Sequence, residues 1–231
     1  MLKKYNKVFV TGDLHLGDVS FDHEAKLVEI LKNNKFDCLV FGGDTFDLWR
    51  ERSVDNIVAK YSQLFKVLQS LKTKVVFIRG NHDMEIDSLR RLGFSIKNKF
   101  KFVNSYGEKI KVIHGDQFDR YCRQYETILR RAVWVEEKMN SMLRKIDNDY
   151  VVRLSSFLGT LDLANIVDNF YGKINAYRNI DKLLFGHIHV PWEGKKGNVD
   201  FYNWGGWQND FGLKPRYLVS EGRDIKTIEI K

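Results

Sequence analysis

Aspartate, asparagine and histidine side chains recur in five short motifs of this 231-residue chain. Five of the six histidines lie in these motifs, each of which follows a predicted β-strand: His15, His82, His114, His187 and His189. A lone histidine after a strand is more often structural than a ligand. Five of the six histidines at one predicted sheet edge indicate that these histidines share a site. Imidazole together with carboxylate and amide oxygens suits Mn²⁺, Fe or Zn²⁺.

The number of candidate ligands favours two metal ions over one. Seven residues supply suitable atoms: Asp13, His15, Asp44, Asn81, His114, His187 and His189. Two pairs among them stand two residues apart, which places both side chains on one side of an extended backbone. Asp44 can use both carboxylate oxygens, so we expect it to bridge the ions. Two ions about 3.5–4 Å apart stabilise in-line displacement at phosphorus. The sequence therefore predicts a cofactor of two divalent metal ions, Mn²⁺ first, with Fe or Zn²⁺ as alternatives.

The stretch 39–47 shows how the chain positions such ligands. Leu39 to Phe41 is apolar and short, which indicates a buried strand rather than an amphipathic helix. Two glycines follow and let the backbone leave the strand in conformations that other residues avoid. Asp44 and Asp47 then stand at the carboxyl end of the strand, the end at which open α/β sheets bind ligands.

The rest of the chain supplies more strands of the same kind. Strands are predicted at 7–11, 38–42 and 75–78, with a helix capped by Asp22 and a longer helix over 53–71 between them. This alternation favours parallel strands with right-handed crossovers. Alternating lysines over 96–102 and 109–112 predict an antiparallel hairpin with a solvated lysine face. Further strands are expected at 182–185 and, as an antiparallel set, at 199–203, 216–220 and 224–230.

A helical insertion is expected over about 120–180 of a single domain that spans 1–231. Its arginines alternate with bulky apolar residues. Ordinary amphipathic helices that pack on the core are one interpretation. The other is a lid or cap over a substrate with an anionic head and an apolar portion, and we take Arg120 and Arg123 as substrate-binding residues because phosphate oxygens attract arginine.

The composition limits the partners and the compartment. A formal charge of +8 suggests an anionic partner, which could be nucleic acid, a phosphorylated metabolite or an acidic membrane surface. The alternative is a lysine-rich solvated surface. The chain has 2 cysteines, no apolar window long enough to span a bilayer and no secretory signal at its start. We therefore expect a cytoplasmic protein with no transmembrane segment that contacts membrane lipid at most peripherally.

The motifs resemble those of the calcineurin-like metallophosphoesterases. The matching segments are Gly12-Asp13-Leu14-His15, Gly43-Asp44-Thr45-Phe46-Asp47, Gly80-Asn81-His82-Asp83, His114-Gly115-Asp116 and Gly186-His187-Ile188-His189. The resemblance implies an α/β fold in which two mixed β-sheets pack as a four-layer sandwich flanked by helices. It also implies one metal held by Asp13, His15, Asp44 and His189, and a second held by Asp44, Asn81, His114 and His187.

Within that superfamily the chain resembles the UDP-2,3-diacylglucosamine pyrophosphatase-like branch. The resemblance rests on the motif 114–119, the helical insertion and the segment 201–207, in which Asn203 approximates an Asn-x-Gly-x-Trp pattern and is taken as substrate-binding. That branch cleaves a pyrophosphate in a lipid-bearing nucleotide sugar. One departure is His82, which stands where the branch carries arginine and which matches the catalytic histidine of the wider superfamily.

The chemistry expected is hydrolysis of a phosphodiester or pyrophosphate by a water that two cations activate. His82 would stabilise charge or protonate the leaving oxygen, and the family pattern implies that Asp47 orients it; a turn cap is the alternative for Asp47. Asp83 and Asp116 are expected to be structural. Two other functions stay open: a nuclease or phosphodiesterase acting on DNA or RNA, and a binding scaffold on a phosphatase fold without activity.

Overall fold

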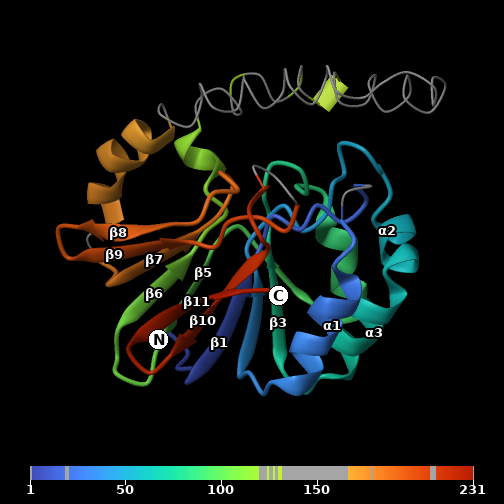
Figure 1. Cartoon of the computed structure of the whole chain (residues 1–231), viewed down its shortest axis with the longest axis horizontal. Helices are drawn as coiled ribbons and strands as arrows, with labels where there is room; N and C mark the ends of the chain where they lie inside the picture. The colour runs from blue at the N-terminus through green and yellow to red at the C-terminus, as the bar shows by residue number, and fades with distance from the viewer. Residues whose placement is uncertain are drawn as a thin grey trace.

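Two β-sheets pack face to face, and helices cover their outer faces (Figure 1). The computed structural model describes residues 2–18, 21–119, 124, 127, 130–131, 166–177, 179–208 and 212–230. Most of the insertion expected over 120–180 lies outside these residues. None of the described helices combines the length and the apolar composition that spanning a bilayer requires.

The first sheet contains the strands that were predicted to be parallel. In spatial order it is β11 (Asp224–Glu229), β10 (Arg216–Glu221), β1 (Lys7–Thr11), β2 (Cys38–Phe41), β3 (Lys74–Ile78) and β4 (Ser95–Lys97). β1 to β4 pair in parallel, and β10 and β11 add an antiparallel edge. The carboxyl ends of β1, β2 and β3 consequently meet at one edge.

The second sheet brings the later motifs to the same edge. Its order is β5 (Phe100–Val103), β6 (Lys109–Val112), β7 (Lys182–Phe185), β9 (Val199–Asn203) and β8 (Trp192–Lys196). β6, β7 and β9 are parallel, whereas β5 and β8 are antiparallel to their neighbours. The predicted sandwich of two mixed sheets is therefore confirmed.

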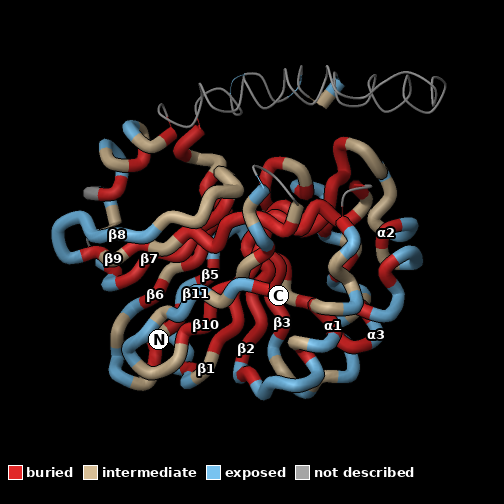
Figure 2. The backbone as a smooth tube through the Cα atoms, in the orientation of Figure 1, coloured by how far each residue is buried: buried red, intermediate tan, exposed pale blue. Residues whose placement is uncertain are grey.

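Alternate residues of the central strands enter different cores. In β1, Val8 and Val10 join the apolar layer between the two sheets, and Phe9 joins the layer under the helices. β1 is buried on both faces, which explains its unbroken apolar run. Figure 2 shows this burial along the middle of the molecule.

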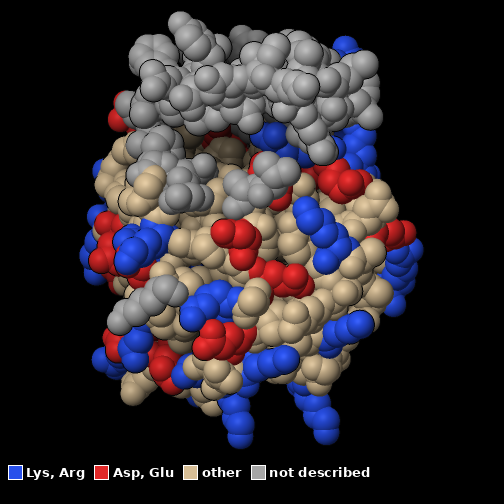
Figure 3. Space-filling view, turned by 45° about the vertical axis from the view of Figure 1, so that its right-hand side comes forward, with Lys and Arg blue, Asp and Glu red and all other residues tan. Residues whose placement is uncertain are grey.

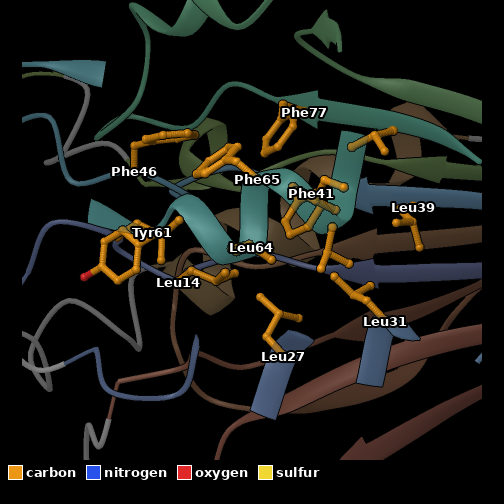
Figure 4. Close-up of a cluster of buried hydrophobic side chains, with 14 of the residues drawn as sticks. Leu14, Leu27, Leu31, Leu39, Phe41, Phe46, Tyr61, Leu64, Phe65 and Phe77 are labelled. Carbon is orange, nitrogen blue, oxygen red and sulfur yellow. The ribbon is translucent and has the colours of Figure 1, made fainter. Parts of the chain in front are cut away.

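The helices α1 (Glu24–Asn33), α2 (Val54–Lys60) and α3 (Ser62–Ser70) lie on the outer face of the first sheet. Leu27 and Leu31 of α1 and Leu64 and Phe65 of α3 pack onto Phe41 and its neighbours (Figure 4). On the outer face of the second sheet, residues 166–173 are helical, and Phe170 stacks on Phe185 with ring centroids 4.8 Å apart. The architecture has four layers.

The single helix predicted over 53–71 is wrong, because two helices replace it. Ser53 caps α2 as its type suggests, with its hydroxyl accepting from the Asn56 N–H at 3.2 Å. The break falls at Tyr61, whose ring is buried against Phe21 and whose hydroxyl accepts the Gly17 N–H. Tertiary contacts of one side chain thus override the helical periodicity.

Three strand assignments also differ from the prediction. The alternating segment 96–102 is divided between sheets: β4 pairs with β3, and β5 forms the expected hairpin with β6. β9 was grouped with β10 and β11 but pairs with β7 and with β8, a strand that the prediction missed. Period-two alternation defines the faces of a strand but carries no information about its partner, so the sequence could not assign these strands to a sheet.

Candidate metal centre

The seven predicted ligands gather where the carboxyl ends of β1, β2, β3, β6 and β7 meet. Three overlapping groups of side chains place their ligand atoms within 4.8 Å of one another. The groups are Asp13, His15 and His189; His15, Asp44 and His82; and Asp44, His114 and His187. Hydrogen bonds between loops hold the arrangement, such as the Asp13 N–H to the Gly43 carbonyl at 2.9 Å and the Gly186 N–H to the His114 carbonyl at 2.7 Å.

One set of ligand atoms surrounds His114. Its Nε2 lies 3.0 Å from Asn81 Oδ1, 3.2 Å from Asp44 Oδ2 and 3.3 Å from His187 Nδ1. Neighbouring ligands at about 2.1 Å from an octahedral ion are about 3 Å apart. The spacing and the donor types of this set therefore fit one divalent cation.

The second set lies around His15. Its Nε2 is 3.2 Å from His189 Nε2, and His189 Nε2 is 3.5 Å from Asp13 Oδ1. Asp44 Oδ2 completes the set at 3.9 Å from His15 Nε2. Two nitrogens and two carboxylate oxygens converge here, so the residues present fit a second cation.

Asp44 lies between the two sets, and one of its carboxylate oxygens faces both. Its Oδ1 accepts the His82 N–H at 2.8 Å, which leaves Oδ2 to face both His114 and His15. The expectation that Asp44 uses both carboxylate oxygens for the ions stays a prediction. Gly80 makes this position of the Asp44 side chain possible, because a Cβ at residue 80 would collide with the Asp44 carboxylate.

The backbone is strained at the candidate ligands. Within the described residues, the non-glycine residues with positive φ are Asp13, His15, Asp44, His187 and His189, with φ between 46° and 75°. Non-glycine residues seldom adopt this region, and doing so costs about 1–3 kcal/mol each. Such strain concentrates at functional sites, and here it turns five side chains inward to the same point.

Burial and mutual charge set the protonation of the ligands. Burial, the largest cause, lowers the pKa of His15 to about 4, so this imidazole is neutral. Burial also disfavours a charged His114, yet the carboxylates of Asp44 and Asp13 outweigh it and raise the pKa of His114 to about 10. Burial favours a neutral Asp44, but His114, His82 and His15 outweigh burial and hold the Asp44 pKa well below its ordinary value.

Asp13 is fixed by residues from the second sheet. The Trp204 indole Nε1–H donates to Asp13 Oδ2 at 2.7 Å, and the His187 N–H donates to the same oxygen at 3.0 Å. Oδ1 thereby faces His189. Trp204 is fully buried between the sheets. The sequence placed Trp204 in a motif but gave it no role at the site.

His82 and Asp47, the predicted catalytic pair, are in contact. His82 Nδ1 lies 3.1 Å from Asp47 Oδ1, and Arg50 Nε lies 3.2 Å from Asp47 Oδ2. Burial opposes charge on His82, but Asp44 and Asp47 outweigh it and hold the pKa of His82 above its ordinary value. Arg50 also pairs with Asp18 at 2.9 Å. Sequence reasoning missed Arg50, although it stands three residues after Asp47.

Trp49 packs against His82 and supports the His82–Asp47 pair. Its indole stacks on the His82 ring with centroids 3.8 Å apart and an interplanar angle of 17°. The indole Nε1–H donates to the Asn81 carbonyl at 2.9 Å, and the Trp49 backbone N–H donates to Asp47 Oδ1 at 3.2 Å. The Trp49 side chain therefore fixes two residues of the β3 loop, and its backbone N–H fixes Asp47 of the β2 loop. An isolated tryptophan in a loop gave no signal of this role.

Asp119 is a further contact that the sequence analysis overlooked. Its Oδ2 lies 3.0 Å from His187 Nε2, while His187 Nδ1 faces His114. A carboxylate on the outer nitrogen of a ligating histidine fixes the ring and its tautomer. The motif 114–119 contained Asp119, and a carboxylate near a candidate ligand was the available signal. Asp83, expected to be structural, accepts the Thr45 N–H at 2.8 Å and the Gly80 N–H at 2.6 Å.

The three predicted substrate-binding residues have different outcomes. Arg120 and Arg123 lie outside the described residues. Asn203 is 2 % exposed; its amide nitrogen donates to the Gly186 carbonyl, and its oxygen accepts the Gly205 N–H. These bonds hold two loops of the site together, so we assign Asn203 a positioning role, and substrate binding by it stays an untested prediction.

The site opens into a cavity of about 270 Å³. The described residues around it are His15, Asp18, Asp44, Asp47, Arg50, Asn81, His82, His187, His189 and Gln208. Candidate metal ligands and the His82–Asp47 pair thus face one space. It can accept an anionic group beside the candidate metal ligands and the His82–Asp47 pair.

Comparison with known proteins gives a consistent result. Residues 6–191 match the family model of the calcineurin-like phosphoesterases. The chain is 27% identical over 195 residues to a UDP-2,3-diacylglucosamine hydrolase of Shewanella sp., covering 78% of this chain and 80% of that protein. It is 22% identical over 198 residues to the enzyme of the same name from Vibrio atlanticus, covering 80% and 81%. The structure of Yfce, a phosphoesterase from E. coli, aligns with a TM-score of 0.52 at 16% identity over 97% of this chain and 100% of that one, which shows a shared fold.

The pKa of His114 predicts proton release on metal binding. At pH 7 the metal-free protein holds His114 protonated, since its pKa is about 10, and a ligating imidazole must be neutral. Binding of Mn²⁺ is therefore expected to release about one proton from His114, and affinity should rise with pH up to that pKa. Calorimetric titration in buffers of different ionisation enthalpy measures the release, with His23→Ala as control. Binding without proton release at pH 7 would contradict this protonation state.

The contact between Asp119 and His187 predicts a weaker metal site in Asp119→Asn. An amide keeps the shape but removes the charge that fixes the His187 tautomer, so we expect a roughly 10–100-fold loss of affinity at one of the two sites. Asp168→Asn, at an exposed carboxylate of the helix 166–173 outside the site, is the matched control and should bind metal as the wild type does. Isothermal titration with Mn²⁺ resolves the two sites. Equal affinities in both variants would argue against the role of Asp119.

Proposed function

Because the chain belongs to the calcineurin-like phosphoesterase family, it is a metal-dependent hydrolase of phosphoester or pyrophosphate bonds, and we propose that two divalent ions serve its reaction. The two sets of donor atoms that meet at Asp44 Oδ2 are the observation that carries this proposal. We propose the ligands as Asp13, His15, Asp44 and His189 for one ion and Asp44, Asn81, His114 and His187 for the other. Nitrogen and oxygen donors without thiolate favour Mn²⁺, with Fe or Zn²⁺ as alternatives.

The ions, when bound, lower the pKa of a coordinated water and offset negative charge on phosphoryl oxygens. The chain's own residues then have separate tasks. Asp44, Asp13 and the histidines hold fixed positions through strained backbone and hydrogen bonds to neighbouring loops. A site organised in advance does not have to reorganise during the reaction, which lowers the barrier.

His82 is proposed as the group that meets the leaving oxygen. Its Nδ1 contacts Asp47, so Nε2 on the opposite side of the ring is the nitrogen for the substrate. The raised pKa favours the protonated imidazole, the form that can donate a proton. Asp47 orients the ring, and Arg50 and Trp49 hold Asp47.

For the substrate, we propose a phosphodiester or pyrophosphate in a nucleotide-sugar or lipid-linked molecule. The support is that the relatives at 22–27% identity are UDP-2,3-diacylglucosamine hydrolases and that their match spans about four-fifths of both chains. A lipid-linked substrate would bring a cytoplasmic protein to a membrane surface only peripherally.

Action on DNA or RNA is the alternative. It would need a basic surface that follows the phosphate backbone. On the face in Figure 3, Lys and Arg are interspersed with Asp and Glu, and they do not form a stripe. A scaffold without activity is disfavoured because every predicted ligand position carries a side chain that can bind a metal ion.

A hydrolysis panel tests the proposal. Mn²⁺-loaded protein would be assayed with a UDP-sugar lipid, dinucleotides, cyclic nucleotides, phosphate monoesters and oligonucleotides. Turnover of a nucleotide-sugar pyrophosphate or a small diester, lost with a chelator, is the expected result. Preferred cleavage of oligonucleotides, falling steeply with salt, would favour the nuclease alternative instead. No Mn²⁺-dependent turnover of any member would refute the proposal.

His82→Ala tests the role of the histidine. Without a proton donor at the leaving oxygen, kcat should fall about 10²–10⁴-fold, while two metal ions stay bound because His82 is outside both proposed ligand sets. Elemental analysis and steady-state kinetics measure the two quantities. The control is His23→Ala, outside the site, with unchanged kcat. An unchanged kcat in His82→Ala would exclude the proposed role.

A further inference from the structure

A second cavity adjoins the metal centre and contains arginines that no step above uses. Its volume is about 480 Å³, larger than the 270 Å³ of the metal cavity. Trp49, Arg52, Glu85, Arg130 and Arg131 line it, together with the apolar side chains of Leu48 and Val54. This set is called the arginine pocket below.

The arginine pocket and the metal cavity share a wall. Trp49 lines the pocket, and His82, on which Trp49 stacks at 3.8 Å, lines the metal cavity. Leu48 joins the two as well, since its backbone N–H donates to the His82 carbonyl at 3.1 Å. The stacked Trp49 ring therefore separates the pocket from His82, the histidine that is proposed to contact the leaving group.

The charges of the pocket favour an anion. Among the described residues that line it, there are three guanidinium groups and one carboxylate, Glu85, whose two oxygens each lie 3.1 Å from Arg130 Nη2. Arg52 and Arg131 are exposed, so a solute can reach them. A guanidinium binds phosphate or carboxylate with two parallel hydrogen bonds. The apolar wall formed by Leu48, Val54 and Trp49 would suit a carbon skeleton beside that anionic group.

The size of the metal cavity gives an independent reason for a second subsite. Pockets that enclose a small organic ligand usually measure about 300–1,000 Å³. A cavity of about 270 Å³ that also has to contain two cations can hold a phosphoryl group but not the whole of a larger ester or anhydride. The rest of the substrate must extend into neighbouring space, and the arginine pocket is that space on the His82 side.

We propose that the arginine pocket binds a second anionic group, a phosphate or carboxylate carried by the leaving portion of the substrate. This inference rests on the proposed function, which places the leaving oxygen at His82. It narrows the substrate to compounds with two separated anionic groups, the scissile phosphoryl group at the metal centre and another beyond the Trp49–His82 pair. Monoesters and diesters whose leaving portion is uncharged would occupy only the first position.

Paired inhibitors test the subsite without requiring turnover. An n-alkylphosphonate and the α,ω-bisphosphonate of the same length, with about three to six methylenes, would be titrated calorimetrically into the full-length protein with excess Mn²⁺. At the spacer length that spans both cavities, the bisphosphonate should bind about tenfold or more tightly, because its second group binds at high effective concentration. A ratio of affinities near one at every length would overturn the proposal.

Substitutions of the pocket arginines test whether the second phosphonate group binds there. Arg52→Gln and Arg131→Gln should each reduce the ratio several-fold, and the double variant should bring it close to one. Arg91→Gln is the matched control, an exposed arginine that pairs with Asp55 outside the pocket and should keep the full ratio. Thermal melting checks that the variants fold.

The outcomes separate this inference from the proposed function. A gain that persists in the folded double variant would mean that the second group binds elsewhere, and the arginine pocket would be rejected. If the panel of substrates shows no Mn²⁺-dependent turnover while the affinity ratio behaves as expected, the proposed function fails and the anion subsite stands.

Discussion

The structure of the site depends on carboxylates and imidazoles that are buried close together where the strands of the two sheets end. Asp13 and Asp44 are 0 % and 2 % exposed, and four imidazoles approach them with ligand atoms about 3–4 Å apart. Buried carboxylates are costly unless cations neutralise them. The protein alone achieves a partial balance by keeping His114 protonated. Divalent ions would replace that proton and satisfy every converging donor, so metal affinity and protonation are coupled in the same cluster.

Residues from both sheets hold this cluster in place. The first sheet contributes Asp13, His15, Asp44 and Asn81 after its parallel strands, and the second contributes His114, His187 and His189. Trp204 joins them, since it is buried between the sheets and its indole donates to Asp13. A substitution of Trp204 that left a cavity or caused a clash would move the proposed ligands of both ions together. This also explains Gly186, where a Cβ would collide with Asp13 and Trp204.

The Trp49–His82 pair links chemistry to substrate selection. On one side His82 contacts Asp47 and faces the metal cavity; on the other side Trp49 lines the arginine pocket. A single stacked pair therefore aligns the proposed proton donor and forms the wall of the proposed subsite. Binding of an anionic leaving portion there would fix the leaving oxygen near His82, which is how binding energy away from the reacting bond contributes to rate.

The sequence by itself determined the types of the candidate ligands, the strand ends that carry them and the sandwich class, because Gly-Asp, Gly-Asn-His and Gly-His after apolar runs are local signals. It could not determine which sheet receives β4, β5 or β9, since alternation defines faces and not partners. Nor could it show that Asp44 accepts the His82 N–H, that Asp119 contacts His187 or that Trp49 supports His82. Those facts depend on distances between residues about 30 to 70 positions apart in the chain, and only the packing of the two sheets fixes such distances.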